Sequence, residues 1–128
     1  MGADFLNKFN KTIYYIEGLD LMVGEVDDIN KYNLMMSVGN VYDDLEDAIK
    51  AIITKIDNYI KVNEKMINEF KSAIKDQEYI KFDLTSKYTK SIKHLKNQIE
   101  KYQTKRSYYE KLLWLDISHM LKHMNEVN

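Results

Sequence analysis

Cysteine and proline are absent from the 128 residues, and glycine occurs only four times. Sandwich folds, collagen-like chains and loop-rich enzymes need proline and glycine at their turns, so the scarcity of both favours a helical chain. The lack of cysteine excludes disulfides, thiolate zinc sites and cysteine nucleophiles. Any catalysis would have to use carboxylates, lysines, tyrosines or the three histidines. The length suits one domain, residues 1–128, with a core of its own.

Long apolar runs are also missing, because charged residues interrupt every stretch of about 20 residues that a membrane span would need. The N-terminus, Met1 to Phe5, does not place an apolar run after a basic region, so we expect no secretory signal peptide. A cytoplasmic protein is the default, or one of the virion or host cytoplasm if it is viral. Lysine greatly outnumbers the single arginine, which indicates an AT-rich genome and suits a phage or viral origin.

The formal net charge of −1 hides an asymmetry along the chain. Residues 1–50 hold ten acids and four bases, a net charge of −6, whereas residues 51–128 hold fifteen bases and ten acids, a net charge of +5. The opposite net charges of the two halves suggest that the two ends of the chain, or two chains, lie against each other.

Residues 40–76 are predicted to form one long helix, because their apolar positions follow a helical period. A heptad seam steps by fours and threes through Leu45, Ile49, Ile52, Ile56, Tyr59, Asn63, Met66, Phe70 and Ala73. A second row recurs at every seventh position, at Ile53, Ile60, Ile67 and Ile74. A stripe two rows wide needs two neighbours, so we expect this helix to lie in a bundle. Asn40 is the expected N-cap, with Asp43 completing a capping box.

Residues 86–125 repeat the pattern and are predicted to form a second long helix. Its seam runs through Tyr88, Ile92, Leu95, Ile99, Tyr102, Arg106, Tyr109 and Leu113. Between the helices, residues 79–85 alternate apolar and polar side chains and precede Ser86, a fair helix cap. We interpret them as a turn that makes the two helices an antiparallel hairpin. The alternative is one unbroken helix, since neither glycine nor proline follows Gly39.

Residues 3–36 have a weaker helical pattern, compatible with one helix bent near Gly18 or Gly24 or with two short helices. This segment is the expected third helix that covers the isoleucine row. The predicted fold is therefore all-α: an elongated antiparallel hairpin that an N-terminal helix completes to a three-helix, coiled-coil-like bundle.

A possible metal site lies near the C-terminus, where one helical face offers four ligand-type side chains: Asp116, His119, His123 and Glu126. The alternative is that they flank the apolar stripe on its solvent side. Di-metal bundles use Glu-x-x-His twice, and this chain lacks that motif. We therefore predict no metal, no cofactor and no catalytic residue.

A basic face is predicted on the second long helix. It comprises Lys87, Lys90, His94, Lys101 and Lys105, with Tyr108 nearby. Lysines neutralise phosphates and tyrosines stack on bases, so this face would suit single-stranded nucleic acid. A solvated face, or a partner for the acidic segment, is the alternative, and the overall pI of about 6.3 favours it.

Three further residues suggest contacts between helices or chains. Asn63 and Arg106 are polar residues in the two seams, where a lone polar side chain can fix register, and they would face each other if the turn lay near Asp83. The alternative is that both face the solvent at the edge of the bundle. Trp114 lies in the densest apolar run, Leu112 to Leu115, and is expected to contact a second chain.

These features predict a non-enzymatic helical protein that binds protein chains, its own copies or others, as a homo-oligomer, adaptor or inhibitor. The alternative is a small nucleic-acid-binding subunit of a ribonucleoprotein or of a phage or viral complex. A metal-binding bundle is a minor alternative. No small-molecule substrate is inferred.

Overall fold

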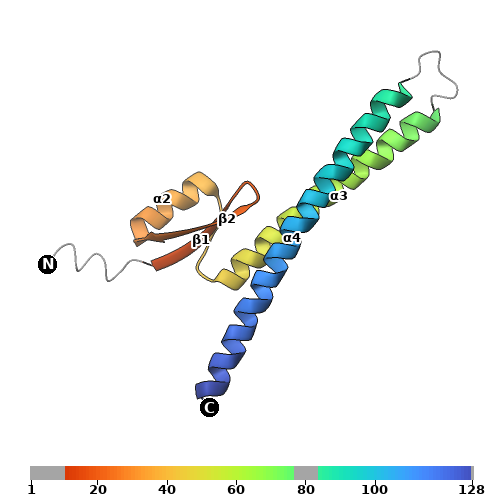
Figure 1. The fold of residues 1–128 in the computed structure, drawn as a ribbon. Coiled ribbons are helices and arrows are strands. Elements are labelled where there is room, and N and C mark those ends of the chain that lie inside the picture. The colour runs from red at the N-terminus through yellow and green to blue at the C-terminus, as the bar shows by residue number, and fades with distance from the viewer. Residues whose placement is uncertain (1–10, 77–83, 128) are drawn as a thin grey trace. The chain divides into compact units, whose positions relative to one another are not determined.

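The computed structural model describes the backbone of residues 11–76 and 84–127, and the side chains of residues 11–76 and 84–116 (Figure 1). The chain divides into two compact units. The first, here called the sheet unit, consists of residues 1–54 and 109–128. The second, the hairpin unit, consists of residues 55–108. The prediction of one domain over residues 1–128 stays a prediction.

The sheet unit is built on three antiparallel strands in the order β2-β1-β3. Strands β1 (Lys11–Glu17) and β2 (Asp20–Val26) form a hairpin in which Glu17 pairs with Asp20, so the turn has two residues. Its first residue, Gly18, has a φ of 63°, as type II′ turns require. Strand β3 (Val41–Tyr42) pairs with the other edge of β1.

Helix α2 (Asp28–Val38) lies beside this sheet (Figure 1). A side-chain oxygen of Asp27 accepts a hydrogen bond from the Asn30 amide over 2.7 Å and caps the helix. The helix ends at Gly39, whose φ of 91° a residue with a side chain rarely adopts. Leu34 and Val38 share one side of α2 and are half-buried, so this side is the one that contributes to the fold.

Helix α3 (Leu45–Asp76) begins five residues later than predicted. Asp44 is its N-cap: the Asp44 side chain accepts from the Glu46 amide, and its carbonyl accepts from the Ala48 amide. Asn40 is not the cap because Val41 and Tyr42 follow it in an extended strand. The first turns of α3 supply most of the described core of the sheet unit. Among its described side chains, the buried apolar residues are Ile13, Ala48, Ile49, Ile52 and Tyr109.

The prediction of an all-α fold is wrong for the N-terminal part of the chain. Residues 11–26 form two strands instead of part of a helix, and α2 is the only helix described before residue 45. Ile13, Tyr14, Tyr15 and Ile16 are β-branched or aromatic, and such residues favour strands. Gly18 follows them at the spacing of a two-residue hairpin turn. The expected N-terminal helix, and with it the three-helix bundle, is therefore replaced by a sheet with one short helix.

The hairpin unit confirms the prediction of two long, separate helices that pack together. Helix α4 (Thr85–Val127) runs antiparallel to α3, because Asp57 pairs with Arg106 while Phe70 contacts Tyr88 (Figure 1). The residues expected to form most of the turn, 77–83, lie outside the described residues. A cluster of apolar side chains holds the two helices together, formed by Ile67, Phe70, Ile74, Ile92, Leu95 and Ile99.

The predicted isoleucine row of α3 is covered, but unevenly. Ile67 is buried, whereas Ile53, Ile60 and Ile74 are half-buried. A strict seven-residue repeat drifts by about 20° per heptad around a straight helix, so its members cannot all face one partner equally. Of the four, Ile67 and Ile74 belong to the apolar cluster with α4.

Candidate interaction surfaces

An apolar surface on α2, here called the α2 face, consists of Ile29, Tyr32 and Met36. These residues step by three and four, so they share one side of the helix, opposite the side of Leu34 and Val38. Ile29 and Met36 are each 74% exposed, and Tyr32 is exposed as well. α2 has no buried residue. Three large apolar side chains on a single helical face are more than scattered surface apolar residues, and they mark this face as a candidate contact surface.

A second exposed pair lies on the C-terminal part of α4. Trp114 is 70% exposed and Leu115 is also exposed, whereas the preceding residues Leu112 and Leu113 are half-buried. Trp114 was predicted to contact a second chain, and within the described residues of this chain its indole is mostly uncovered. Tryptophan is among the residues that contribute most to protein interfaces when they become buried.

A third surface is a furrow between α3 and α4 in the hairpin unit, here called the hairpin groove. It comprises two adjoining hollows of about 370 Å³ and 200 Å³ that share Met66 and Phe70. Its lining residues are Met66, Glu69, Phe70, Ala73, Tyr88, Lys90, Ser91, His94 and Leu95. Most of the lining is apolar, and its polar residues are Glu69 on α3 and Lys90, Ser91 and His94 on α4. An open furrow of this kind between two helices suits the apolar side of a third helix.

A larger hollow, of about 650 Å³, lies along α3 between Lys61 and Asp76. It is lined by side chains of this one helix, and lysines alternate there with acids. Within the described residues no second element lines it, and its charges are mixed, so we interpret it as an ordinary solvated helix surface.

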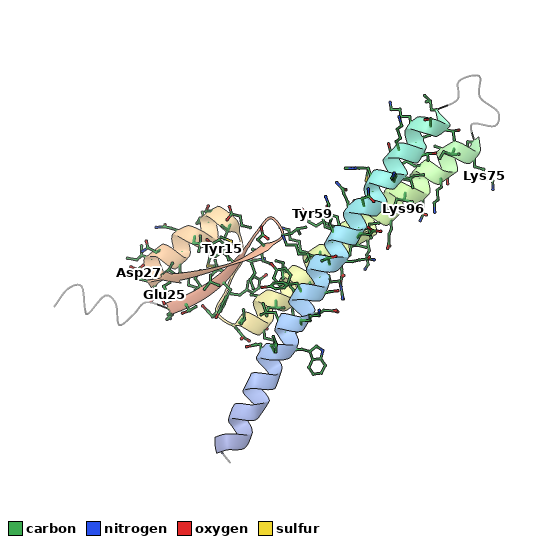
Figure 2. All side chains as sticks on the ribbon, viewed as in Figure 1. Tyr15, Glu25, Asp27, Tyr59, Lys75 and Lys96 are labelled. Carbon is green, nitrogen blue, oxygen red and sulfur yellow. The ribbon has the colours of Figure 1, made fainter. Side chains whose placement is uncertain are left out.

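The predicted basic face of α4 lies at the surface of the hairpin unit. Lys87, Lys90, His94 and Lys101 are exposed, Lys105 is half-buried, and Tyr108 is exposed. Lys75, near the end of α3, and Lys96, on α4, project from the same unit (Figure 2). The hairpin unit has thirteen basic and seven acidic residues, a net charge of +6, and the sheet unit has a net charge of −7. The charge asymmetry along the sequence is therefore an asymmetry between the two units.

Acidic side chains gather where α3 begins, in the sheet unit. Lys31 donates to Asp43 over 2.8 Å, and Lys50 donates to Glu46 over the same distance. The hydrogen bond and charge of Glu46 raise the pKa of Lys50 above its ordinary value, with smaller contributions from Asp47 and Asp44. Even with these two pairs, acids outnumber bases in this unit, which therefore presents a negative surface.

The two seam residues have different partners across the hairpin. Asn63 is buried, and its side-chain amide donates to Gln98 over 3.2 Å. Gln98 is also within 3.1 Å of the Nε2 atom of His94. Arg106 forms an ion pair with Asp57 instead. The expectation that Asn63 and Arg106 face each other is wrong, because the hairpin register places residue 63 opposite residue 98.

The predicted metal ligands are only partly described. Asp116 is half-buried, and the side chains of His119, His123 and Glu126 lie outside the described residues. Among the side chains of residues 11–76 and 84–116, no three histidine or carboxylate side chains come close enough to hold a metal ion. The prediction about this C-terminal face stays a prediction.

The α2 face was not predicted from the sequence. The sequence pattern that marks this face is short. Asp27 caps the helix and Gly39 ends it, and Ile29, Tyr32 and Met36 follow a helical spacing between them. In the expected long N-terminal helix, these residues fall into the same pattern as their neighbours. Only the strands before residue 27 set α2 apart as an element of its own.

Comparison of the chain with protein-family models, with curated proteins and with solved structures gave no match. Among the described residues, no helix combines the length and the apolar character needed to cross a membrane. The surfaces themselves are therefore the basis for a functional proposal.

Proposed function

We propose that this protein is a non-enzymatic module that binds other protein chains, and that it acts as an oligomer or an adaptor. The observation that carries the proposal is the α2 face. Covering one large apolar side chain contributes about 1.5–3 kcal/mol, so the three on this face together would offset several kcal/mol of the cost of association.

The other surfaces support the same function. Trp114 and Leu115 offer a second apolar contact, and the hairpin groove offers a receptor for an amphipathic helix. The opposite net charges of the two units would steer charged partners to different parts of the chain. These three features require no cofactor and no chemical step.

Photo-crosslinking in the native host tests this proposal. A photoreactive amino acid replaces Met36 or Trp114, and the matched control replaces Asn97, an exposed polar residue of α4. We expect covalent protein adducts from positions 36 or 114 that the control position does not form. If neither apolar position forms more adducts than position 97, the proposal fails.

Nucleic-acid binding is the second candidate, and the exposure of Lys87, Lys90 and Lys101 on one unit of net charge +6 is the observation that favours it. Titration of a labelled single strand at two salt concentrations tests it. Binding that weakens steeply with salt would support this candidate, and no binding at low salt would end it.

A further inference from the structure

We propose that the α2 face of one copy of this chain docks into the hairpin groove of a second copy. The inference rests on the proposed function, since it names the partner. Both halves of the contact are present in every chain: an exposed apolar helix face in the sheet unit, and an open apolar furrow in the hairpin unit.

The two surfaces match in length. From Ile29 to Met36 the α2 face spans eight residues, a rise of about 10.5 Å over seven steps of 1.5 Å. On α3 the floor of the groove runs from Met66 to Ala73, which is also eight residues. On α4 it runs from Tyr88 to Leu95, again eight residues. Two helical turns of apolar side chains therefore face a furrow two turns long.

The two surfaces also match in charge. The α2 face belongs to a unit of net charge −7, and the groove belongs to a unit of net charge +6. At the groove itself, Lys90 lines the α4 side and Glu69 lines the α3 side, so the attraction comes from the net charges of the two units as wholes. On α2, the exposed carboxylate of Asp28 precedes the apolar face and is available to a cation such as Lys90, because its contact with Lys11 is loose, at 3.6 Å, and solvent-exposed. Two copies would therefore attract each other in this orientation, whereas contacts between like units would repel.

A second copy is favoured over an unrelated partner because the matching apolar face is present on this chain. The contact is heterologous, since it joins two different surfaces. It closes into a dimer that uses the contact twice if the rotation between copies is twofold, and otherwise it extends to further copies. A single contact of one short helix is small, so we expect association in the micromolar range or weaker unless it closes.

The test is a complementation experiment with two variants, measured by light scattering during size-exclusion chromatography. Met36→Asp damages the α2 face, and Met66→Glu damages the groove. The matched controls are Asn30→Asp on α2 and Asn68→Glu on α3, which add the same charge at exposed positions of the same helices. Ser91→Tyr, which fills the groove from α4, is a second groove variant that adds no charge. Circular dichroism and thermal unfolding confirm that each variant is folded.

We expect the unmodified chain and both controls to self-associate at several hundred micromolar, with the dissociation constant rising several-fold when the salt is increased. Each damaged variant alone should be monomeric, with its dissociation constant raised at least about tenfold. Mixed together, Met36→Asp and Met66→Glu should form a one-to-one dimer, because the first keeps its groove and the second keeps its α2 face.

Three results would overturn the inference: an unmodified chain that is monomeric throughout, damaged variants that associate as the controls do, or a mixture that stays monomeric. Photo-crosslinks from position 36 to other proteins, combined with a monomeric chain, would overturn this inference and leave the proposed function standing. If the chain is monomeric and positions 36 and 114 also form no crosslinks above the control position, the proposed function fails as well.

Discussion

The side-chain amide of Asn63 donates to the Oε1 atom of Gln98 over 3.2 Å and joins α3 to α4 inside the hairpin unit. Asn63 is only 7% exposed, whereas Gln98 is half-buried and reaches Nε2 of His94 at the surface. The hydrogen bonds thus lead from the apolar interior to the solvent. Sliding one helix along the other would bury the Asn63 amide away from Gln98, so this bond helps to select the register.

Gln98→Ala should therefore lower the free energy of unfolding by about 1–3 kcal/mol, because it takes a partner from a buried amide. The double variant Asn63→Leu with Gln98→Ala should recover most of that loss, since no buried polar group remains. Urea denaturation measures both. The matched control, Asn97→Ala on the exposed side of α4, should change stability by less than about 0.5 kcal/mol. Equal losses in Gln98→Ala and Asn97→Ala would contradict the register role.

The ion pair between Arg106 and Asp57 should contribute modestly to the stability of the hairpin unit. Both side chains are about one-third exposed, so solvent screens their interaction. We expect a coupling energy near 1 kcal/mol at low salt, at the upper end for exposed pairs, because a planar guanidinium holds a carboxylate well. A double-mutant cycle with Asp57→Ala and Arg106→Ala measures it, and high salt should reduce it. No coupling even at low salt would show that the pair contributes nothing.

Tyr109→Phe should destabilise the sheet unit. The buried Tyr109 hydroxyl accepts from the Leu21 amide over 3.1 Å and donates to the Leu19 carbonyl over 3.4 Å. Losing the acceptor of a partly buried amide should cost about 1–2 kcal/mol and speed hydrogen exchange at Leu21. Tyr108→Phe is the adjacent control: Tyr108 is 61% exposed, and we expect little change. Similar exchange rates at Leu21 in the two variants would refute this role of Tyr109.

Gly18→Ala should cost roughly 1 kcal/mol, because alanine is strained at a φ of 63° and nothing else near this position would be gained. Gly24→Ala is the control on β2. Its φ is not positive, and an added methyl group would meet the Ile13 side chain at 3.6 Å, an ordinary contact distance. Thermal unfolding measures the stability of both variants. If Gly24→Ala loses as much stability as Gly18→Ala, the positive φ of the turn is not the cause of the loss.

The long helices could be predicted from the sequence because their heptad seams repeat over many turns. Each added heptad, such as Ile56 to Asn63 to Phe70 on α3, makes a strand or loop less compatible with the pattern. Their separation into two helices was also predictable, since strand-forming residues interrupt the repeat near Phe82. The exact register was not. It depends on where the turn is centred: an error of four residues in that position moves the residue opposite Asn63 by eight, from Gln98 to Arg106.

The strands were missed because one set of residues fitted two periods. Ile13, Ile16 and Leu19 are spaced as on a helix, yet Ile13 to Ile16 is also an unbroken run of strand formers. Pairing with β2 and β3 decides in favour of a strand over a helix. This pairing involves residues outside any short window of sequence, so the window alone does not predict it. The start of α3 was misplaced for the same reason, since Val41 and Tyr42 pair with β1.

Of the candidate surfaces, Trp114 and the α4 basic face could be named from the sequence because exposure and charge on a long helix follow its seam. The hairpin groove could not be predicted from the sequence. It is formed by residues on two helices, such as Met66 and Ser91, that come together only in the observed register.

The most direct measurement of whether this protein works by binding protein chains is the accessibility of the α2 face in the cell. The chain has no cysteine, so Met36→Cys provides a single reporter thiol, and Lys93→Cys on the outer side of α4 provides its control. Maleimide labelling rates are compared between dilute purified protein and producing host cells. We predict that Cys labelling at position 36, relative to position 93, falls several-fold in cells because a protein chain covers it. An unchanged ratio would contradict the proposal.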